Sequence, residues 1–195
     1  MIGHDLKNTI QKAMSVYAQV SGLTLDQLSC VTTLVKCNEE ELLERERDMI
    51  QSEFIVVEGV VRGFVLNERG DDLTLSFYQN GNAISPAIMR GVKGRSMYNL
   101  QVVSRYATIL VFNCLKMERI MSYNTDLQQF GNAVIMFDSL RRVEKEVLLL
   151  KEPAKTKLAW FRKTYPGLEN QIPHYFIASF LGITPTSLSR VRSKL

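Results

Sequence analysis

Residues 126–150 constrain the fold of this chain most, because their apolar side chains recur at helical spacing over an unusual length. The recurring residues, at intervals of three and four, are Phe130, Ala133, Phe137, Leu140, Val143, Val147 and Leu150. A helix of about 25 residues is roughly 37 Å long, more than the core of one small domain needs. We therefore predict a dimerisation helix, and the alternative is a helix that lies across the rest of the fold. The residues predicted to form the dimer interface are Phe130, Ala133, Phe137, Leu140 and Val147.

Short apolar runs precede this helix between about residues 31 and 112, separated by polar or glycine-containing turns. The runs at residues 53–64, 73–78, 98–103 and 108–112 are typical of strands, and the turn candidates lie at 67–72 and 79–82. Gly59 and Gly63 lie inside the first run and predict a bend or a bulge there. This pattern favours an antiparallel β-barrel or jelly roll.

Helical patterns flank the predicted strands. Leu6, Ile10, Ala13, Met14, Tyr17 and Val20 predict an N-terminal helix with Gly22 as its C-cap, and a short second helix follows Thr24. Another short helix is expected near residues 117–122. The chain is therefore expected to be an α+β protein.

A domain boundary is expected at residue 151, because Pro153 disfavours helical geometry in the residue before it. The prediction has three parts: residues 1–125 form a sensor barrel with N-terminal helices, 126–150 the long helix, and 151–195 a small helical domain. Its first helix, about 154–165, carries Trp160, which we expect in the core. The chain as a whole has a net charge of +4, but residues 151–195 carry +6 and residues 1–150 carry −2. Such asymmetry is expected when one part docks on a polyanion, and a solvated basic face is the alternative.

The last 23 residues carry the pattern of a helix-turn-helix. Ile177, Ala178 and Leu181 share a helical face, Gly182 permits a turn with positive φ, and Ile183, Leu188 and Val191 continue the apolar set. Thr184 is a good N-cap for the second helix, and Pro185 suits its first position. An ordinary helical hairpin is the alternative.

The outward face of that second helix predicts contacts with double-stranded DNA. Arg190 suits a bidentate pair with guanine, and short hydroxyl side chains near the helix start suit base edges or phosphates. Arg192, Lys194 and His174 suit phosphate contacts. The predicted DNA-binding set is His174, Thr184, Thr186, Ser187, Ser189, Arg190, Arg192 and Lys194.

This order of parts resembles the cyclic-AMP receptor protein and fumarate-nitrate regulator family (CRP/FNR). The most specific likeness is the segment 177–190, which is similar to the family's helix-turn-helix, and the segment 54–62 resembles its strand-and-glycine stretch. The resemblance implies a cyclic-nucleotide-binding-like barrel, a winged-helix-type reader domain, a homodimer, DNA contacts by Thr186, Ser187 and Arg190, and RNA polymerase as a further partner. Because the chain ends four residues after Val191, a wing hairpin after the reading helix is expected to be absent, and any wing strands must precede it.

The nucleotide cassette departs from the family pattern. Members that bind cyclic AMP carry a Gly-Glu pair for the ribose and an Arg-Ser pair for the phosphate. Arg95 and Ser96 match the second pair, but the region of the first reads as residues 82–86 without a carboxylate, so cyclic-AMP binding is not expected. A small anionic effector is predicted instead at Arg90, Lys93, Arg95 and Ser96, with solvated loop cations as the alternative.

Cofactors and catalysis are not expected. Cys30, Cys37 and Cys114 are too few and too scattered for the four ligands of an iron-sulfur cluster, and His4 and His174 lie outside the barrel, which disfavours haem. A cupin-type enzyme needs histidines and a carboxylate inside the barrel, and none occurs from residue 73 to 117. No signal peptide or membrane span is evident, so a cytoplasmic protein is predicted. The alternative function is a ligand-binding or protein-interaction module that does not bind DNA.

Overall fold

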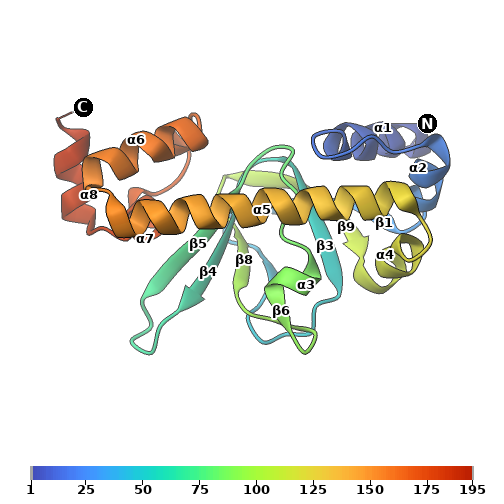
Figure 1. Ribbon diagram of the computed structural model, residues 1–195, viewed down its shortest axis with the longest axis horizontal. Coiled ribbons are helices and arrows are strands. Elements are labelled where there is room, and N and C mark those ends of the chain that lie inside the picture. Colours follow the sequence, from blue (N-terminus) through green and yellow to red (C-terminus); the bar gives the residue numbers. More distant parts are fainter. Residues whose placement is uncertain (1, 195) are drawn as a thin grey trace.

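The computed structural model describes residues 2–194 as a β-barrel with helices at both ends, all connected along one long helix (Figure 1). This helix, α5 (Thr125–Lys151), has 27 residues. The Asn124 side chain caps its start by accepting a hydrogen bond from the Leu127 amide at 3.1 Å, and Pro153 follows its end. The predicted limits, 126–150, are each within one residue of the observed ones.

Two helices pack on the N-terminal half of α5. They are α1 (Ile2–Met14) and α2 (Gly22–Ser29), and their core with α5 includes Ile10, Met14, Leu28, Leu127 and Phe130. The prediction that Gly22 caps the first helix is wrong, because Gly22 begins α2. The hydroxyl of Ser21, which accepts a hydrogen bond from the Thr24 amide at 3.3 Å, is the N-cap of that second helix.

The barrel consists of two antiparallel sheets. One has the order β1-β9-β3 and the other β2-β8-β4-β5. The strands are β1 (Thr32–Asn38), β2 (Leu42–Glu44), β3 (Ser52–Glu58), β4 (Val61–Leu66), β5 (Asp72–Tyr78), β8 (Asn99–Val102) and β9 (Tyr106–Asn113). Their inward side chains form one core that includes Phe54, Val61, Tyr98, Leu100 and Ile109. The antiparallel barrel expected from the strand pattern is therefore confirmed.

Residues 53–64, which read as one strand in the sequence, form two strands in different sheets. Gly59 turns the chain between them with a φ of +90°. A Cβ at this position would lie 2.5 Å from the carbonyl oxygen of Tyr106, so only glycine fits. Gly63 lies beside the register shift between β4 and β5, which confirms the bulge.

Smaller elements close one side of the barrel. They are α3 (Ala87–Arg90), the hairpin of β6 (Gly91–Val92) and β7 (Arg95–Ser96), and α4 (Cys114–Met121), which leads into α5. No helix within residues 2–194 is both long and apolar enough to cross a membrane.

The C-terminal part comprises α6 (Ala154–Thr164), a 3-10 turn (Leu168–Asn170), α7 (His174–Phe180) and α8 (Pro185–Arg192), here called the reader. Trp160 is half-buried and stacks on Phe180, as expected of a core residue. No wing strands lie within the reader, because residues 114–194 contain no strand. The chain between α6 and α7 forms a tight 3-10 turn instead.

The reader packs directly on the barrel. Phe77 of β5 is fully buried and its ring contacts Phe161, Tyr165 and Phe180 at centroid distances of 5.1–6.1 Å. The Ser179 hydroxyl joins α7 to the same strand, since it accepts from the Thr74 amide at 2.9 Å and donates to the Asp72 carbonyl at 3.1 Å. The reader and the barrel therefore share one core.

Lys145 of α5 is held at this junction and has no carboxylate partner within residues 2–194. Its Nζ donates to the Leu75 carbonyl at 2.8 Å and lies 4.0 Å from the Phe180 ring centroid. Burial, with a smaller effect of the Arg142 charge, lowers the pKa of Lys145 to about 8.

This pKa makes the stability of the junction depend on pH. The unfolded chain keeps the Lys145 proton up to its ordinary pKa of 10.5, whereas the folded chain loses it near 8. Between these two pH values the unfolded chain therefore binds more protons at Lys145 than the folded chain does. For this reason Lys145 makes the free energy of unfolding rise with pH across that range. Urea unfolding at several pH values should show a shallower rise for Lys145→Met than for the wild type. Lys151→Met, at an exposed lysine of the same helix, is the control, and identical pH profiles for all three proteins would contradict the assignment.

Candidate nucleic-acid interface and effector cassette

The helix-turn-helix predicted from the sequence is present in α7 and α8. The Thr184 hydroxyl caps α8 by accepting from the Ser187 amide at 3.1 Å, and Pro185 is the first helical residue. Gly182 has a φ of +60° in the turn. Ala178 is buried and its carbonyl accepts from the Ile183 amide at 3.0 Å, which closes the corner. Local sequence chemistry therefore determines this turn.

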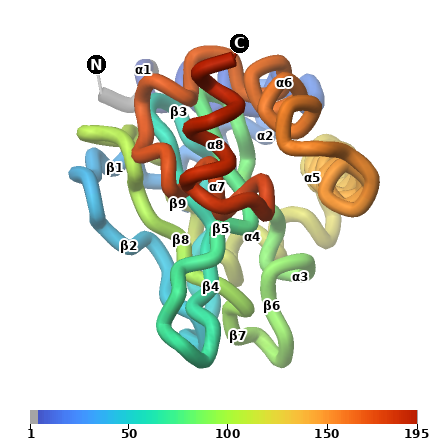
Figure 2. Tube along the Cα trace, turned by 90° about the vertical axis from the view of Figure 1, so that its left-hand side faces the viewer, coloured from blue at the N-terminus to red at the C-terminus, as the bar shows by residue number. Residues whose placement is uncertain are grey.

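One side of α8 anchors the helix and the other is free. Leu188 is buried in the reader core, while α8 as a whole lies at the outer end of the molecule (Figure 2). The exposed residues on its outer side are Thr186, Ser189, Arg190, Ser193 and Lys194. Within residues 2–194, the side chains of Thr186, Ser189 and Arg190 form no hydrogen bond or ion pair. Their hydrogen-bonding groups are thus available to a partner.

Thr184 and Ser187 are already engaged with each other. The Thr184 hydroxyl donates to the Ser187 hydroxyl at 2.9 Å, in addition to its capping bond. Both stabilise the first turn of α8. The Ser187 hydroxyl accepts in this pair and keeps its own proton to donate to a phosphate or a base acceptor, whereas the Thr184 hydroxyl has used its proton and can only accept a further bond. A hydroxyl oxygen has that capacity.

Arg192 and His174 belong to an internal ion-pair cluster. The Arg192 Nε lies 2.6 Å from Glu169, which also binds Arg162 at 2.5 Å, and an Arg192 terminal nitrogen lies 3.0 Å from the His174 Nδ1. The Arg162 hydrogen bonds are the main cause that lowers the pKa of Glu169. Arg192 thus fastens the end of α8 to α6 and α7. The sequence prediction did not include Glu169 as a partner of these cations. Its rarity was a possible signal, because only one other acidic residue, Glu152, lies beyond residue 150.

An apolar stripe on α5 is exposed. It consists of Met136, Leu140, Val143, Val147 and Leu150, which are 53–84% exposed and follow each other at intervals of four, three, four and three. This spacing is that of the a and d positions of a coiled coil, and the half-buried Ala133 extends it by one step. Three residues of the predicted interface, Ala133, Leu140 and Val147, therefore lie on one free seam.

The other two predicted interface residues lie elsewhere. Phe130 is buried and its ring meets Tyr17 edge to face at 5.6 Å, so it belongs to the core under α1. Phe137 also contacts the Tyr17 ring at 5.7 Å and the Arg141 guanidinium at 5.3 Å. Phe130 is therefore not on the exposed seam, whereas Phe137 is 42% exposed and lies beside Met136, a seam residue that the prediction did not include. A helix with two neighbouring apolar stripes offers both at spacings of three and four, so the sequence pattern does not separate them.

The region that matches the nucleotide cassette is filled by the chain itself. Ser85 is fully buried, and its hydroxyl bonds with Tyr78 at 3.1 Å, Asp138 at 2.7 Å and Arg142 at 3.0 Å. The hydroxyl of Tyr98 completes the network 3.4 Å from Tyr78. Burial raises the pKa of Tyr98 well above its ordinary value, so this group keeps its proton. Side chains of α5 thus occupy the mouth of the barrel.

Arg90 does not fit its predicted role as an effector ligand. Its guanidinium is fully buried and pairs with Glu44 at 3.1 Å and Glu53 at 3.0 Å. It also donates to the carbonyls of Ser52 and Ser85. A buried guanidinium needs a partner for each of its N–H groups, and these four acceptor groups supply them. No N–H of Arg90 is therefore left to donate to an anion.

The remaining predicted effector residues do not converge. Ser96 is buried and donates to the Tyr98 carbonyl at 2.8 Å. Lys93 is exposed in the turn between β6 and β7, and Arg95 is exposed and donates to the Arg47 carbonyl at 2.9 Å. Of the four, only Lys93 and Arg95 face solvent. Residues 2–194 also contain no group of three or more His, Cys, Asp or Glu side chains placed to hold a metal ion.

Comparison with solved structures gives matches over most of the chain. FixK2 from Bradyrhizobium japonicum is 17% identical, with a TM-score of 0.73 over 85% of this chain and 84% of that one. The c-di-GMP-responsive global regulator CLP from Xanthomonas campestris is 12% identical, with a TM-score of 0.68 over 89% and 91%. A protein described as a CRP/FNR-family transcriptional regulator from Eubacterium rectale is 14% identical, with a TM-score of 0.69 over 90% and 83%.

No protein-family model and no curated protein matches the sequence. The structural matches nevertheless extend from the barrel through the long helix to the reader. The chain therefore has the fold of the CRP/FNR transcriptional regulators, and the resemblance drawn from residues 54–62 and 177–190 is confirmed as a likeness of fold.

Asp138 provides a test of the self-filled cassette. Asp138→Asn removes the charged acceptor that Ser85 and Arg142 share, so we expect the free energy of unfolding to fall by about 1–3 kcal/mol. Glu144→Gln, at an exposed position on the same helix, should change it by less than about 0.5 kcal/mol. Urea denaturation of both variants measures the difference. Equal stabilities would show that the network does not hold α5 on the barrel.

Proposed function

We propose that this protein is a homodimeric, sequence-specific DNA-binding transcription regulator that reads a major groove with α8. The observation that carries the proposal is the free outer side of α8, with Thr186, Ser189, Arg190 and Lys194 exposed and Leu188 anchored behind them. An α-helix with such a surface fits the width of the major groove. The CRP/FNR fold supports the same function.

Each side chain of α8 has a distinct proposed role. Arg190 has a guanidinium fork with no internal partner, which suits the two acceptors on the edge of guanine. Thr186 and Ser189 lie toward the start of the helix and suit base edges or phosphates, as do Ser187 and the capping Thr184. Lys194 is a flexible cation suited to a phosphate. Arg192 holds the helix through Glu169 and His174, and both side chains suit phosphates at the edge of the reader.

Dimerisation is supported by the exposed seam on α5. Apolar side chains at five consecutive a and d positions are costly to leave in water, and a second copy of the helix covers them in register. A twofold axis along the seam presents two α8 helices, which matches paired half-sites on DNA. This arrangement makes a partner helix part of the functional unit.

Effector control differs from that of nucleotide-binding regulators. CLP is described as responsive to c-di-GMP, whereas here Ser85, Asp138 and Arg142 fill the corresponding cassette. This network supports the proposal that the barrel takes neither cyclic AMP nor another anion there. Contact with RNA polymerase, a cytoplasmic location and the lack of catalytic activity stay predictions from the resemblance.

Selection from random duplex DNA tests the function. We expect the full chain to enrich fragments that carry a motif with twofold symmetry. A pool that stays unenriched at low salt would overturn DNA reading and favour the alternative, a protein-interaction module of the same fold.

Two substitutions in α8 separate the proposed roles. Arg190→Ala should cost about 1–3 kcal/mol on the selected site and relax the preference at one base pair. Lys194→Ala should weaken binding to all sequences about equally and reduce the salt slope by about one. Binding titrations on selected and scrambled duplexes at three salt concentrations measure both. Equal losses for the two variants on every duplex would contradict the assignment.

The seam is tested by Leu140→Asp. A carboxylate at the centre of a helix pair cannot be buried without a partner, so this variant should sediment as a monomer and lose affinity for the symmetric site. Leu140→Met keeps the apolar character and is the control that stays dimeric. If the wild type itself sediments as a monomer at micromolar concentration, the dimer proposal is wrong.

A further inference from the structure

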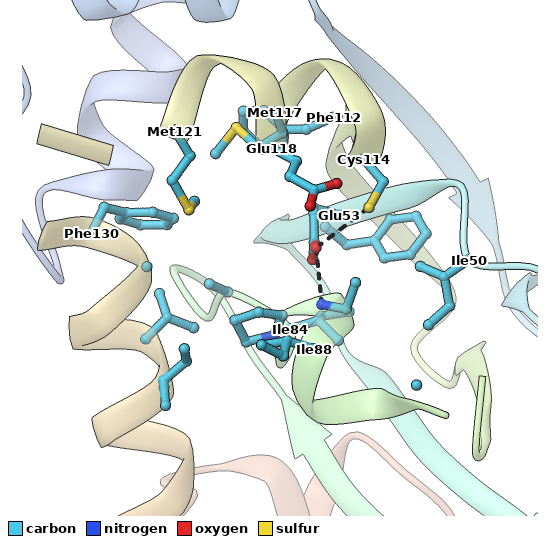
Figure 3. Close-up of a pocket in the computed structure, with 18 of the residues that line it drawn as sticks. Ile50, Glu53, Ile84, Ile88, Phe112, Cys114, Met117, Glu118, Met121 and Phe130 are labelled. Atoms are coloured by element: carbon cyan, nitrogen blue, oxygen red, sulfur yellow. Dashed lines mark hydrogen bonds between the residues drawn. The ribbon is translucent and has the colours of Figure 1, made fainter. Parts of the chain in front are cut away.

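A cavity lies between the barrel and the first half of α5; Ala83, Ile84 and Pro86 of the cassette region line it, and the side chains of the Ser85 network do not. Its volume is about 880 Å³, and β3, α3, α4 and α5 form its walls (Figure 3). Small-molecule sites in proteins commonly have volumes of about 300–1,000 Å³. The cavity is therefore large enough for a ligand and separate from the Ser85 network.

The walls of this cavity are mostly apolar. The buried residues Phe54, Phe112, Met117, Phe130 and Val134 are part of its lining. At its rim the side chains of Ile88 and Leu115 are 81% and 76% exposed and extend the apolar surface outward. An apolar ligand would cover both the floor and this rim, and burial of that surface favours binding.

Charge in the cavity has one sign. Its lining contains the carboxylates of Glu53 and Glu118 and no lysine, arginine or histidine. Glu53 is engaged by Arg90 at 3.0 Å and by the Ala87 amide at 2.9 Å. The Glu118 carboxylate forms no hydrogen bond or ion pair within the described chain, residues 2–194. Figure 3 shows both carboxylates and the Cys114 thiol gathered at the same side of the cavity.

The potential on this side is negative. Arg90 supplies one positive charge here, against three carboxylates, those of Glu44, Glu53 and Glu118. Burial, together with the charge of Glu53, raises the pKa of the Cys114 thiol. An anionic ligand would meet uncompensated repulsion here, whereas a cation would gain a partner for Glu118.

We propose that this cavity binds an apolar small molecule with a cationic amine head group. The apolar body lies between α5 and the Phe54 face of β3, and the amine lies beside Glu118. The ligand touches α5 at Gly131 and Ile135, next to Met136 of the exposed seam. This site takes the opposite charge from the anionic effector expected from the sequence, and it does not depend on DNA binding.

Competition with a fluorescent probe tests the ligand class. The uncharged dye N-phenyl-1-naphthylamine should bind the full chain saturably, with one site per chain. Decylamine, 1-decanol and decanoate have the same chain length and differ in charge, and they are added below their micelle concentrations. Decylamine should displace the dye at a concentration at least about threefold lower than 1-decanol, and decanoate should be the weakest. No saturable dye binding, or equal displacement by decanoate and decylamine, would overturn the proposal.

Substitutions locate the site and its charge. Ala87→Trp and Asn132→Trp place a ring in the cavity from opposite walls and should each abolish dye binding, whereas Gln129→Trp, at an exposed position of α5 outside it, should not. Glu118→Gln should remove the advantage of decylamine over 1-decanol and leave 1-decanol unchanged. Glu146→Gln is its control. Unchanged dye binding in both cavity-filling variants, or an unchanged amine advantage in Glu118→Gln, would contradict the assignment.

Discussion

The packing of α5 against every other part of the molecule is the interaction on which the structure depends. Phe130 and Val134 enter the core under α1 and α2, Asp138 binds Ser85 inside the barrel, and Lys145 reaches the reader at Phe180. One rigid helix thus fixes the barrel and the reader relative to each other. The apolar seam of α5 stays exposed, and it is the apolar surface that a second copy would cover.

Contacts of α7 position the reader on the barrel and leave the outer side of α8 free. Arg62 of β4 is buried, binds Asp72 at 2.5 Å and lies 3.6 Å from the ring centroid of Phe176. Together with the Phe77 cluster this contact fastens α7 to the barrel. Because α7 bears the anchoring contacts, the side chains of Thr186, Ser189 and Arg190 on α8 stay available to a ligand outside the protein. This difference between α7 and α8 arises because α7 contains aromatic residues that pack on the barrel and α8 contains none.

Several features of the fold were predictable because they depend on residues close together in the sequence. The turn at Gly182, the Thr184 cap and the stop at Pro153 act within a few residues, so the sequence alone indicates them. Contacts between residues distant in sequence were not predictable. Phe130 and Phe137 fit the interface spacing, but both contact Tyr17. Arg90 has the sequence context of a loop cation, but in the structure it is paired with Glu44 and Glu53. In each case the partner is distant in sequence, and no local pattern around it indicates the contact. The fold class and the reader were therefore foreseen, and the filled cassette and the cavity were not.

The central claim is that two α8 helices read DNA together, and footprinting tests it most directly. Hydroxyl-radical cleavage of a duplex enriched by the wild-type protein should reveal two protected patches on one face of the DNA. Their centres should lie about 34 Å apart, one helical turn of about 10 base pairs. A single protected patch, or uniform cleavage at a protein concentration that saturates the duplex, would contradict the account.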